Sequence, residues 1–149
     1  MTSVTALAEE LERRVYLQRT IQEFTKPEYM LLIQYAIRML FIDTLRALEY
    51  KNYEYTLGEV ENEEDEPEEF FSCEFEIDEE EYILLVAEIQ FLKIIQKDVN
   101  TITSYTTNAI SVTGADKPYA HLADSIAQLE LRRNELLLRM LRFTHSVSS

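Results

Sequence analysis

The sequence offers few residues that could bind a metal ion. Its two histidines, His121 and His145, are far apart in the chain, and neither lies in an HExxH or ExxH pattern. The acidic run between positions 52 and 81 lacks the alternating aspartate and asparagine, with a central glycine, that a calcium-binding loop requires. The sequence therefore predicts no metal site and no cofactor.

Nucleophiles and phosphate-binding loops are also missing. Cys73 belongs to no nucleophile motif, and the carboxylates around it would disfavour its thiolate, so we expect it to pack inertly. Asp43 has no histidine or second carboxylate placed to exchange a proton with it. Gly58 and Gly114 are the only glycines, too few for a phosphate-binding loop. We expect a protein that is not an enzyme.

Negative charge is concentrated in one segment. The formal net charge is −14, and residues 52–81 contain fifteen acidic residues and no basic one. The rest of the chain holds the other 13 acidic residues and all 14 basic residues, so it is nearly neutral. Binding to nucleic acid through its phosphates needs clustered lysine and arginine. The acidic segment is therefore expected to repel nucleic acid or to meet a basic partner.

The composition favours a mainly α fold in a single helical domain, residues 1–149. Two glycines and three prolines leave few tight turns, and the first residues show no signal-peptide pattern. Apolar spacing, cap residues and first-turn prolines predict a four-helix body. The helices are expected from a cap at Thr2 or Ser3 to about Phe24, from Pro27 to about Glu49, from Glu79 to Ser104, and from Pro118 to Phe143, with a flexible tail at 144–149.

Residues 52–78 differ from the helical regions because their apolar residues alternate with polar ones. Tyr53, Tyr55 and Leu57 form one alternating run, which predicts a short strand. A second run contains Phe71, Cys73, Phe75 and Ile77. The very acidic residues between the two runs predict a mobile loop, so this segment is expected to be a protruding β-hairpin. A two-stranded hairpin is marginally stable alone, so its aromatic face needs support from the chain's own helices or from the next subunit.

A further alternating pair, Ile110 and Val112, predicts a short extended segment before the last helix. Exposed strand edges are ready sites for pairing between copies of a chain. We therefore predict a subunit interface made by residues of the hairpin and of this segment. Its members are Tyr53, Tyr55, Phe71, Phe75, Ile77, Ile110 and Val112.

The helix predicted at Glu79–Ser104 is apolar on nearly every side in its first half. A helix of this kind must be covered on more than one face, by the same chain or by a neighbouring copy. It is too short to span a membrane, and Glu88, Gln90 and Lys93 interrupt its apolar residues. The rest of the chain is expected to be organised around it.

One local stretch resembles a known family. The residues YTTNAISV at 105–112, followed by DKPY at 116–119, are similar to the head–tail connector (adaptor) proteins of tailed bacteriophages. The similarity covers about the last third of the chain. It implies a structural virion protein at the neck, made in the host cytoplasm, that forms a ring, commonly a dodecamer. Such a ring docks under the portal protein, binds the next neck or tail protein below, and surrounds the channel for genome ejection.

The resemblance also implies roles for particular residues. The C-terminal helix and tail would contact the portal through Arg139, Arg142, Phe143, His145 and Val147. DNA would pass through the lumen without specific binding, because acidic walls do not hold phosphates. The acidic segment could line such a channel or point outward, and the acids that would line it are Glu61, Glu63, Glu64, Asp65 and Glu66.

Two other functions are compatible with the sequence. An acidic DNA-mimic or inhibitor protein would use the acidic run to occupy a basic cleft. A cytoplasmic helical regulator or chaperone would use its apolar stripes as a groove for client proteins. Salt-sensitive binding to a basic DNA-binding protein would favour the first of these.

Overall fold

The computed structural model describes residues 1–16, 24–107 and 121–148, with side chains described for 1–16, 24–98 and 121–142. The elements of these residues are β1 (Thr2–Ser3), α1 (Val4–Arg14), α2 (Lys26–Asp43), the short 3-10 helix η2 (Tyr50–Asn52), β2 (Tyr55–Leu57), β3 (Glu69–Phe71), α3 (Ile77–Thr107) and α4 (Leu122–Ser148).

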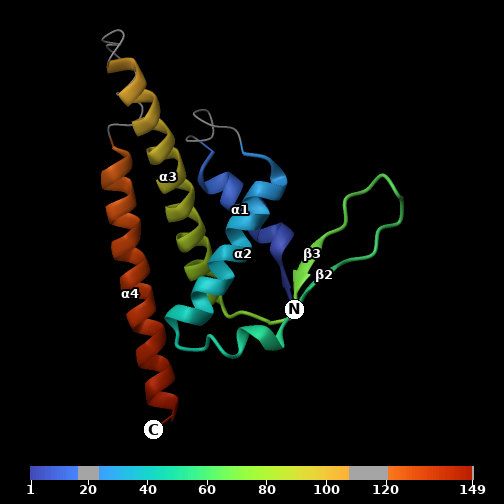
Figure 1. Cartoon of the computed structure of the whole chain (residues 1–149). Coiled ribbons are helices and arrows are strands. Elements are labelled where there is room, and N and C mark those ends of the chain that lie inside the picture. The colour runs from blue at the N-terminus through green and yellow to red at the C-terminus, as the bar shows by residue number, and fades with distance from the viewer. Residues whose placement is uncertain (17–23, 108–120, 149) are drawn as a thin grey trace.

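The long helix α3 lies in the middle of the molecule (Figure 1). Helices α1 and α2 pack against it on one side, and α4 runs antiparallel to it on another. The small sheet lies beside α1, and the loop between β2 and β3 projects away from the body. The predicted mainly α fold, with four helices and a hairpin, is confirmed.

Helix α3 is covered by its own chain. Most of its apolar residues from Tyr82 to Ile95 are buried in one core shared with α1, α2 and α4. Tyr82 is fully buried, and its hydroxyl donates a hydrogen bond of 2.5 Å to Oδ2 of Asp43. Burial raises the pKa of Tyr82, so the hydroxyl keeps the proton that it donates. Asp43 therefore links α2 to α3.

Helix α1 ends at Arg14, so the predicted continuation to Phe24 is wrong. Val15 and Phe24 are nonetheless buried, and the ring centroid of Phe24 lies 4.7 Å from that of Phe91 in α3. The apolar spacing in this region predicted the burial of Val15 and Phe24, but Tyr16, which continues the same spacing, is 55% exposed. It overestimated the helix because buried residues beyond the helix end continue the same pattern.

Helix α2 begins at Lys26, one residue before the predicted start at Pro27, but it ends earlier than predicted. Thr25 and Glu28 form a capping box in which each side chain accepts a hydrogen bond from the other's backbone N–H, and Pro27 lies in the first turn. These signals fix the start. At the other end the helix stops at Asp43 rather than near Glu49.

The early end of α2 has a backbone cause. Leu45 has a φ of 63°, in the left-handed region, and it follows the last turn of the helix. The N–H of Arg46 donates to the carbonyl of Phe41 at 2.7 Å, and the N–H of Leu45 donates to that of Ile42 at 3.1 Å. This is the Schellman arrangement, in which glycine usually occupies the left-handed position. With leucine there, the sequence shows no stop signal.

Replacing Leu45 with glycine is expected to raise the free energy of unfolding by about 1 kcal/mol, because glycine adopts positive φ without strain. Leu45 is 87% exposed, so removing its side chain costs little packing. Leu48→Gly is the matched control, an exposed leucine in the same connection without a positive φ. Urea denaturation of both variants measures the difference. A Leu45→Gly variant no more stable than Leu48→Gly would contradict the assignment of strain.

The sheet has three antiparallel strands in the order β1-β3-β2. In β3, Phe71 lies opposite Thr2 of β1 on one side and Tyr55 of β2 on the other. The predicted hairpin is therefore confirmed as the β2–β3 pair. Strand β1 was not predicted, because two residues are too few to show an alternating pattern.

The strands are shorter than the alternating runs predicted. Tyr53 precedes β2, Cys73 and Phe75 are buried outside any strand, and Ile77 is the first residue of α3. Extended chain buries every second side chain whether or not a neighbouring strand pairs with it. The alternation therefore placed Phe71, Cys73 and Phe75 on one side of the chain, and all three face the core. It did not show where the strand ends.

Helix α4 continues to Ser148, so the residues predicted as a flexible tail from 144 are helical as far as Ser148. No proline or glycine interrupts the helix after its first residue. The extended segment expected at Ile110 and Val112 lies outside the described residues. Among the residues that the structure describes, no helix combines the length and apolar character needed to cross a membrane.

Candidate functional site

The described residues contain no group of three His, Cys, Asp or Glu side chains that could hold a metal ion. Cys73 is buried, and its Sγ lies 3.6 Å from the carbonyl oxygen of Glu74. Desolvation raises the pKa of this thiol, which disfavours the reactive thiolate. The surfaces that could serve a function are therefore the exposed ones.

The aromatic face of the hairpin packs into the chain's own core. Phe71 is completely buried, and its ring centroid lies 4.7 Å from that of Tyr55, 5.7 Å from Tyr53 and 5.9 Å from Phe75. The ring of Phe41 in α2 closes the cluster at 6.2 Å from Phe71. Helix α2 thus provides the support that the hairpin needs.

This packing divides the set predicted as a subunit interface. Phe71 and Phe75 face the core of their own chain, so they present no surface to a neighbour. Tyr53 and Tyr55 are half-buried beside them, and Ile77 is 86% exposed at the start of α3. Ile110 and Val112 lie outside the described residues.

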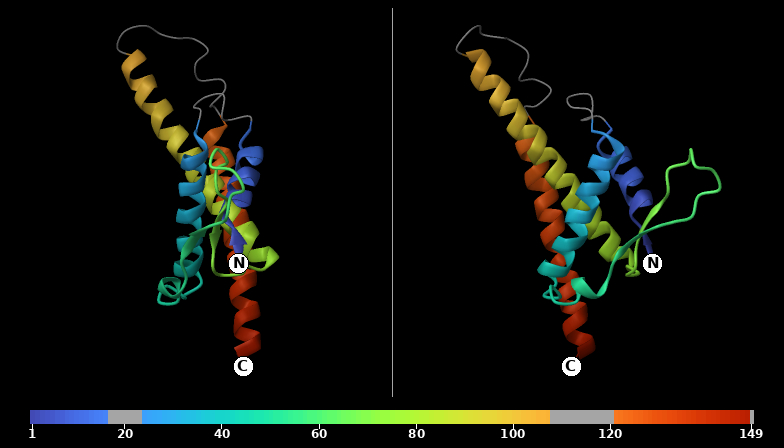
Figure 2. Two further views of the ribbon diagram at one scale, coloured as in Figure 1. Left: turned by 90° about the vertical axis from the view of Figure 1, so that its right-hand side faces the viewer. Right: turned by 45° about the vertical axis from the view of Figure 1, so that its right-hand side comes forward.

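The acidic loop, residues 59–68, projects from the edge of the body opposite α4 (Figures 1 and 2). Every residue of the loop is exposed, and seven of the ten are acidic. Lys26 lies 3.5 Å from Glu66, but both side chains are solvated, so this ion pair contributes little. The acids predicted to line a channel, Glu61, Glu63, Glu64, Asp65 and Glu66, all belong to this loop.

The base of the acidic loop is fixed to the body. The N–H of Gly58 donates to the carbonyl of Glu68 at 2.7 Å across the two arms. The N–H of Glu69 donates to Oγ1 of Thr5 in α1 at 2.8 Å, and the hydroxyl of Ser3 donates to the carboxylate of Glu68. A Cβ at Gly58 would lie 3.0 Å from the ring of Phe70, so a side chain there would force the arms apart. The loop therefore projects from an ordered stem.

The acids at 78–81 have a different role from those of the loop, because arginines of other elements hold three of them. Glu81 accepts two hydrogen bonds from the guanidinium of Arg14, at 3.0 and 2.6 Å. This bidentate geometry is the strong form of the arginine–carboxylate pair. The other contacts are Arg132–Glu81 at 3.8 Å, Arg46–Glu79 at 3.2 Å and Arg139–Asp78 at 3.4 Å. The start of α3 is thereby tied to α1, to the connection after α2, and to α4.

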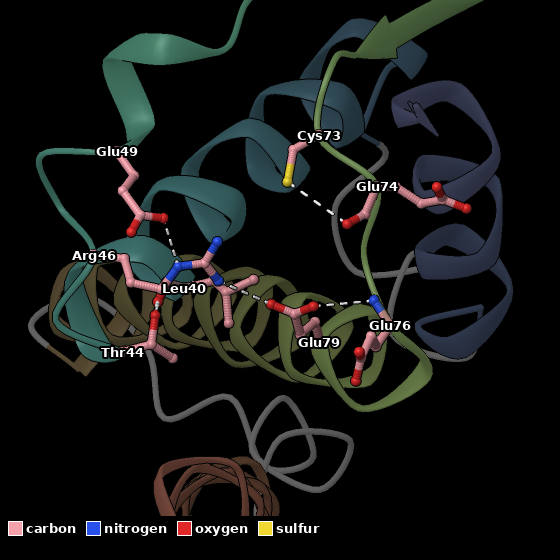
Figure 3. A network of polar contacts seen from close by, with 8 residues as sticks. All are labelled: Leu40, Thr44, Arg46, Glu49, Cys73, Glu74, Glu76 and Glu79. Atoms are coloured by element: carbon pink, nitrogen blue, oxygen red, sulfur yellow. Dashed lines mark hydrogen bonds and ion pairs between the residues drawn. The ribbon is translucent and has the colours of Figure 1, made fainter. Parts of the chain in front are cut away.

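Arg46 is the centre of one of these links (Figure 3). Its Nε donates to Glu49 at 2.8 Å and its guanidinium lies over the ring of Phe41, 5.0 Å from the centroid. Glu79, which receives the second hydrogen bond from Arg46, also accepts one from the N–H of Glu76 at 3.0 Å. The network fixes the connection after α2 against the first turn of α3.

The free energy of unfolding is predicted to depend on pH through Glu88. Desolvation raises the pKa of its carboxyl, and nearby Glu81 adds to the shift, whereas Arg14 and Arg132 oppose it. The folded chain therefore binds this proton at a higher pH than the unfolded chain does. The resulting stabilisation is complete at acidic pH and is lost as pH rises through the raised pKa.

Replacing Glu88 with glutamine is expected to raise the free energy of unfolding at pH 7 by roughly 0.5–1 kcal/mol. The gain should shrink as the pH approaches about 4, because the native carboxyl is protonated there. Glu135→Gln, on an exposed part of α4, is the control. Denaturation between these pH values measures both. A stability gain that does not vary with pH would rule out titration of Glu88 as the cause.

Helix α4 has two apolar faces, and only one packs on α3. Leu122, Ile126, Leu129 and Leu136 are buried against the core. A second set, which we call the outer face, follows the alternating spacing of four and three residues that brings side chains to one stripe. Its members are Ala127, Leu131, Asn134, Leu138 and Leu141. Leu131 is 61% and Leu138 is 56% exposed, so the side chains that the structure describes leave both leucines uncovered.

The residues expected at the portal lie towards the end of α4. Arg139 is exposed and contacts Asp78 through one nitrogen, and Arg142 is exposed beyond it. Phe143, His145 and Val147 belong to the last turns of the helix, which extend past the body (Figure 2). The structure thus brings these five positions to one end of the molecule.

The outer face was missed in the sequence, although its spacing was visible. Leu131, Leu138 and Leu141 lie between the residues of the buried stripe, so the two faces merge into one broadly apolar helix when only periodicity is considered. Separating the faces required knowing which side of α4 packs on α3. Comparison with protein-family models, curated proteins and solved structures finds no match to this chain.

Proposed function

We propose that this chain is a structural assembly protein, a head–tail connector subunit that forms a ring between a phage portal and the next neck or tail protein. The observation that carries the proposal is the uncovered outer face of α4. Leu131 and Leu138 are exposed to solvent, whereas the opposite face of the same helix is buried. Exposed leucines on one side of a helix can form part of a protein–protein contact.

Two further features support an assembly role. The acidic loop stands on an ordered stem and projects from the edge opposite α4, so each copy has two separate surfaces to offer. The end of α4 extends past the body, where it can reach a protein above or below a ring. The stretch at 105–119, which resembles connector proteins, is the feature that favours a phage neck as the place of this assembly.

The DNA-mimic alternative is less well supported. Mimicry of phosphates needs carboxylates fixed at regular spacing, but arginines of the same chain hold Asp78, Glu79 and Glu81. Seven of the remaining acids lie in one projecting loop. A regulator or chaperone would also use the outer face of α4. The identity of the protein that binds there therefore distinguishes such a regulator or chaperone from a connector.

Removing the protein from an infecting phage tests the proposal. We expect cells that lack it to accumulate DNA-filled heads and separate tails, because the joint between them is missing. Mass spectrometry of purified wild-type virions should detect the chain at several copies per particle. Infectious particles formed without the chain would overturn the proposal.

A further inference from the structure

We propose that the acidic loop of one copy docks on the outer face of α4 in a second copy. Residues 59–68 would lie along the stripe formed by Ala127, Leu131, Asn134, Leu138 and Leu141. The contact is head-to-tail, because different surfaces of the two copies meet, and such contacts generate rings when the rotation closes. The inference rests on the proposed function only in identifying the ring that this contact would build.

The two surfaces lie on opposite edges of one molecule. The loop extends from the sheet, whereas α4 lies on the far side of α3 (Figures 1 and 2). Helices α1, α2 and α3 separate them, so a loop cannot reach the outer face of its own α4. A second copy placed beside the first can supply the missing partner for each surface.

Charge complementarity selects the loop as the occupant. The loop carries seven acids, whereas residues 131–142 carry four arginines and one acid, a local charge of +3. Arg132 and Arg139 lie seven residues apart on one side of α4, beside the outer face, and are 62% and 68% exposed. Each forms an ion pair through one terminal nitrogen, and a guanidinium has five N–H donors. Carboxylates of a second copy can therefore bind while Glu81 and Asp78 stay in place.

The apolar parts of the two surfaces also match. Val60 in the loop and Leu57 at its stem are exposed, although both are large apolar residues. They can cover Leu131 and Leu138 while the loop acids meet the arginines. One arm of the loop is about 15 Å long when extended, and the stripe from Leu131 to Leu141 is about 15 Å along the helix.

Long-range repulsion between copies works against this contact but does not abolish it. Each copy has a net charge of −14, and the loop contributes seven of those charges. At an ionic strength of about 0.15 M the Debye length is about 8 Å, so distant charges are screened while contacting pairs are not. In this arrangement, Glu61, Glu63, Glu64, Asp65 and Glu66 lie at the boundary between subunits rather than on the wall of a channel.

Sedimentation velocity of the purified chain alone tests the contact without any portal protein. The loop variant carries Glu63→Lys and Glu64→Lys, and the helix variant carries Leu131→Gln and Leu138→Gln, which keep helix propensity. Glu54→Lys with Glu74→Lys is the matched control, since it makes the same change in net charge at exposed positions outside the loop. Thermal unfolding confirms that all three fold.

We expect the wild type and the control to self-associate at high protein concentration, and each blocked variant to stay at 17.6 kDa. An equimolar mixture of the loop variant and the helix variant should form a complex of two chains and nothing larger, because one intact contact remains. Self-association of the loop variant by itself would show that α4 faces pair with each other and would overturn the proposal. A monomeric wild type, or a mixture without complexes, would also overturn it. None of these outcomes depends on whether the chain binds a portal.

Discussion

Replacing Phe71 with alanine is expected to lower the free energy of unfolding by about 3–5 kcal/mol, the loss typical of removing a buried aromatic ring. Phe71 is fully buried at the centre of the sheet and contacts rings from the hairpin and from α2. The cavity would separate the hairpin from the helices. Urea denaturation monitored by circular dichroism gives the difference from the wild type.

Phe70→Ala is the matched control, because Phe70 precedes Phe71 in the same strand but is only half-buried. Its loss is expected to be about 1–2 kcal/mol. Equal losses at the two positions would mean that Phe71 does not form the junction between hairpin and helices. The core position assigned to the predicted aromatic face would then be wrong.

Leu136→Ala is expected to lower the free energy of unfolding by about 2–5 kcal/mol, whereas Leu138→Ala should change it by no more than about 0.5 kcal/mol. The two leucines lie two residues apart on α4, and alanine preserves helix propensity at both. Leu136 is 5% exposed against α3, but Leu138 belongs to the outer face. The measurement needs dilute protein. If copies associated through Leu138, that association would raise the apparent free energy of unfolding.

Comparable losses in the two leucine variants would contradict the assignment of an uncovered outer face. Leu138 would then be covered within one chain, and the surface that carries the proposed assembly role would not exist. A small loss at Leu136 would instead mean that α4 is loosely attached to α3. Leu129, which is buried, and Leu131, which is exposed, form a second pair for the same comparison.

The parts of the fold with strong local signals could be predicted from the sequence. Thr25, Pro27 and Glu28 mark the start of α2, because a capping box and a first-turn proline act within a few residues. The apolar surplus of α3 predicted its cover on more than one face. The alternating aromatic residues predicted the hairpin and a shared face for Phe71 and Phe75, which the structure shows packed in the core of their own chain.

Features that depend on distant residues could not be predicted. Strand β1 forms because Thr2 pairs with Phe71 from the other half of the chain. The end of α2 depends on Leu45 in a conformation that leucine rarely adopts. At the candidate site, the charge run from 52 to 81 gave no sign that its last acids are held by arginines such as Arg14 and Arg139.

The structure changes the physical basis of the proposed assembly. From Tyr82 to Ile95, helix α3 needs no neighbouring copy, because most of its apolar residues there are buried against α1, α2 and α4. Surfaces left for partners include the outer face of α4, the acidic loop and the end of α4, and helix α2 also exposes Leu31, Tyr35 and Ile42. Assembly is therefore expected to join copies that are already folded, so single chains should remain stable when diluted.

Mass measurement of the chain with and without a phage portal protein tests the proposed connector role most directly. We predict that it adds to the portal ring in equal copy number, commonly twelve per ring as the resemblance implies, and that the Leu131→Gln and Leu138→Gln variant fails to complete that ring. A chain that stays at 17.6 kDa at every concentration and binds no portal would contradict the account.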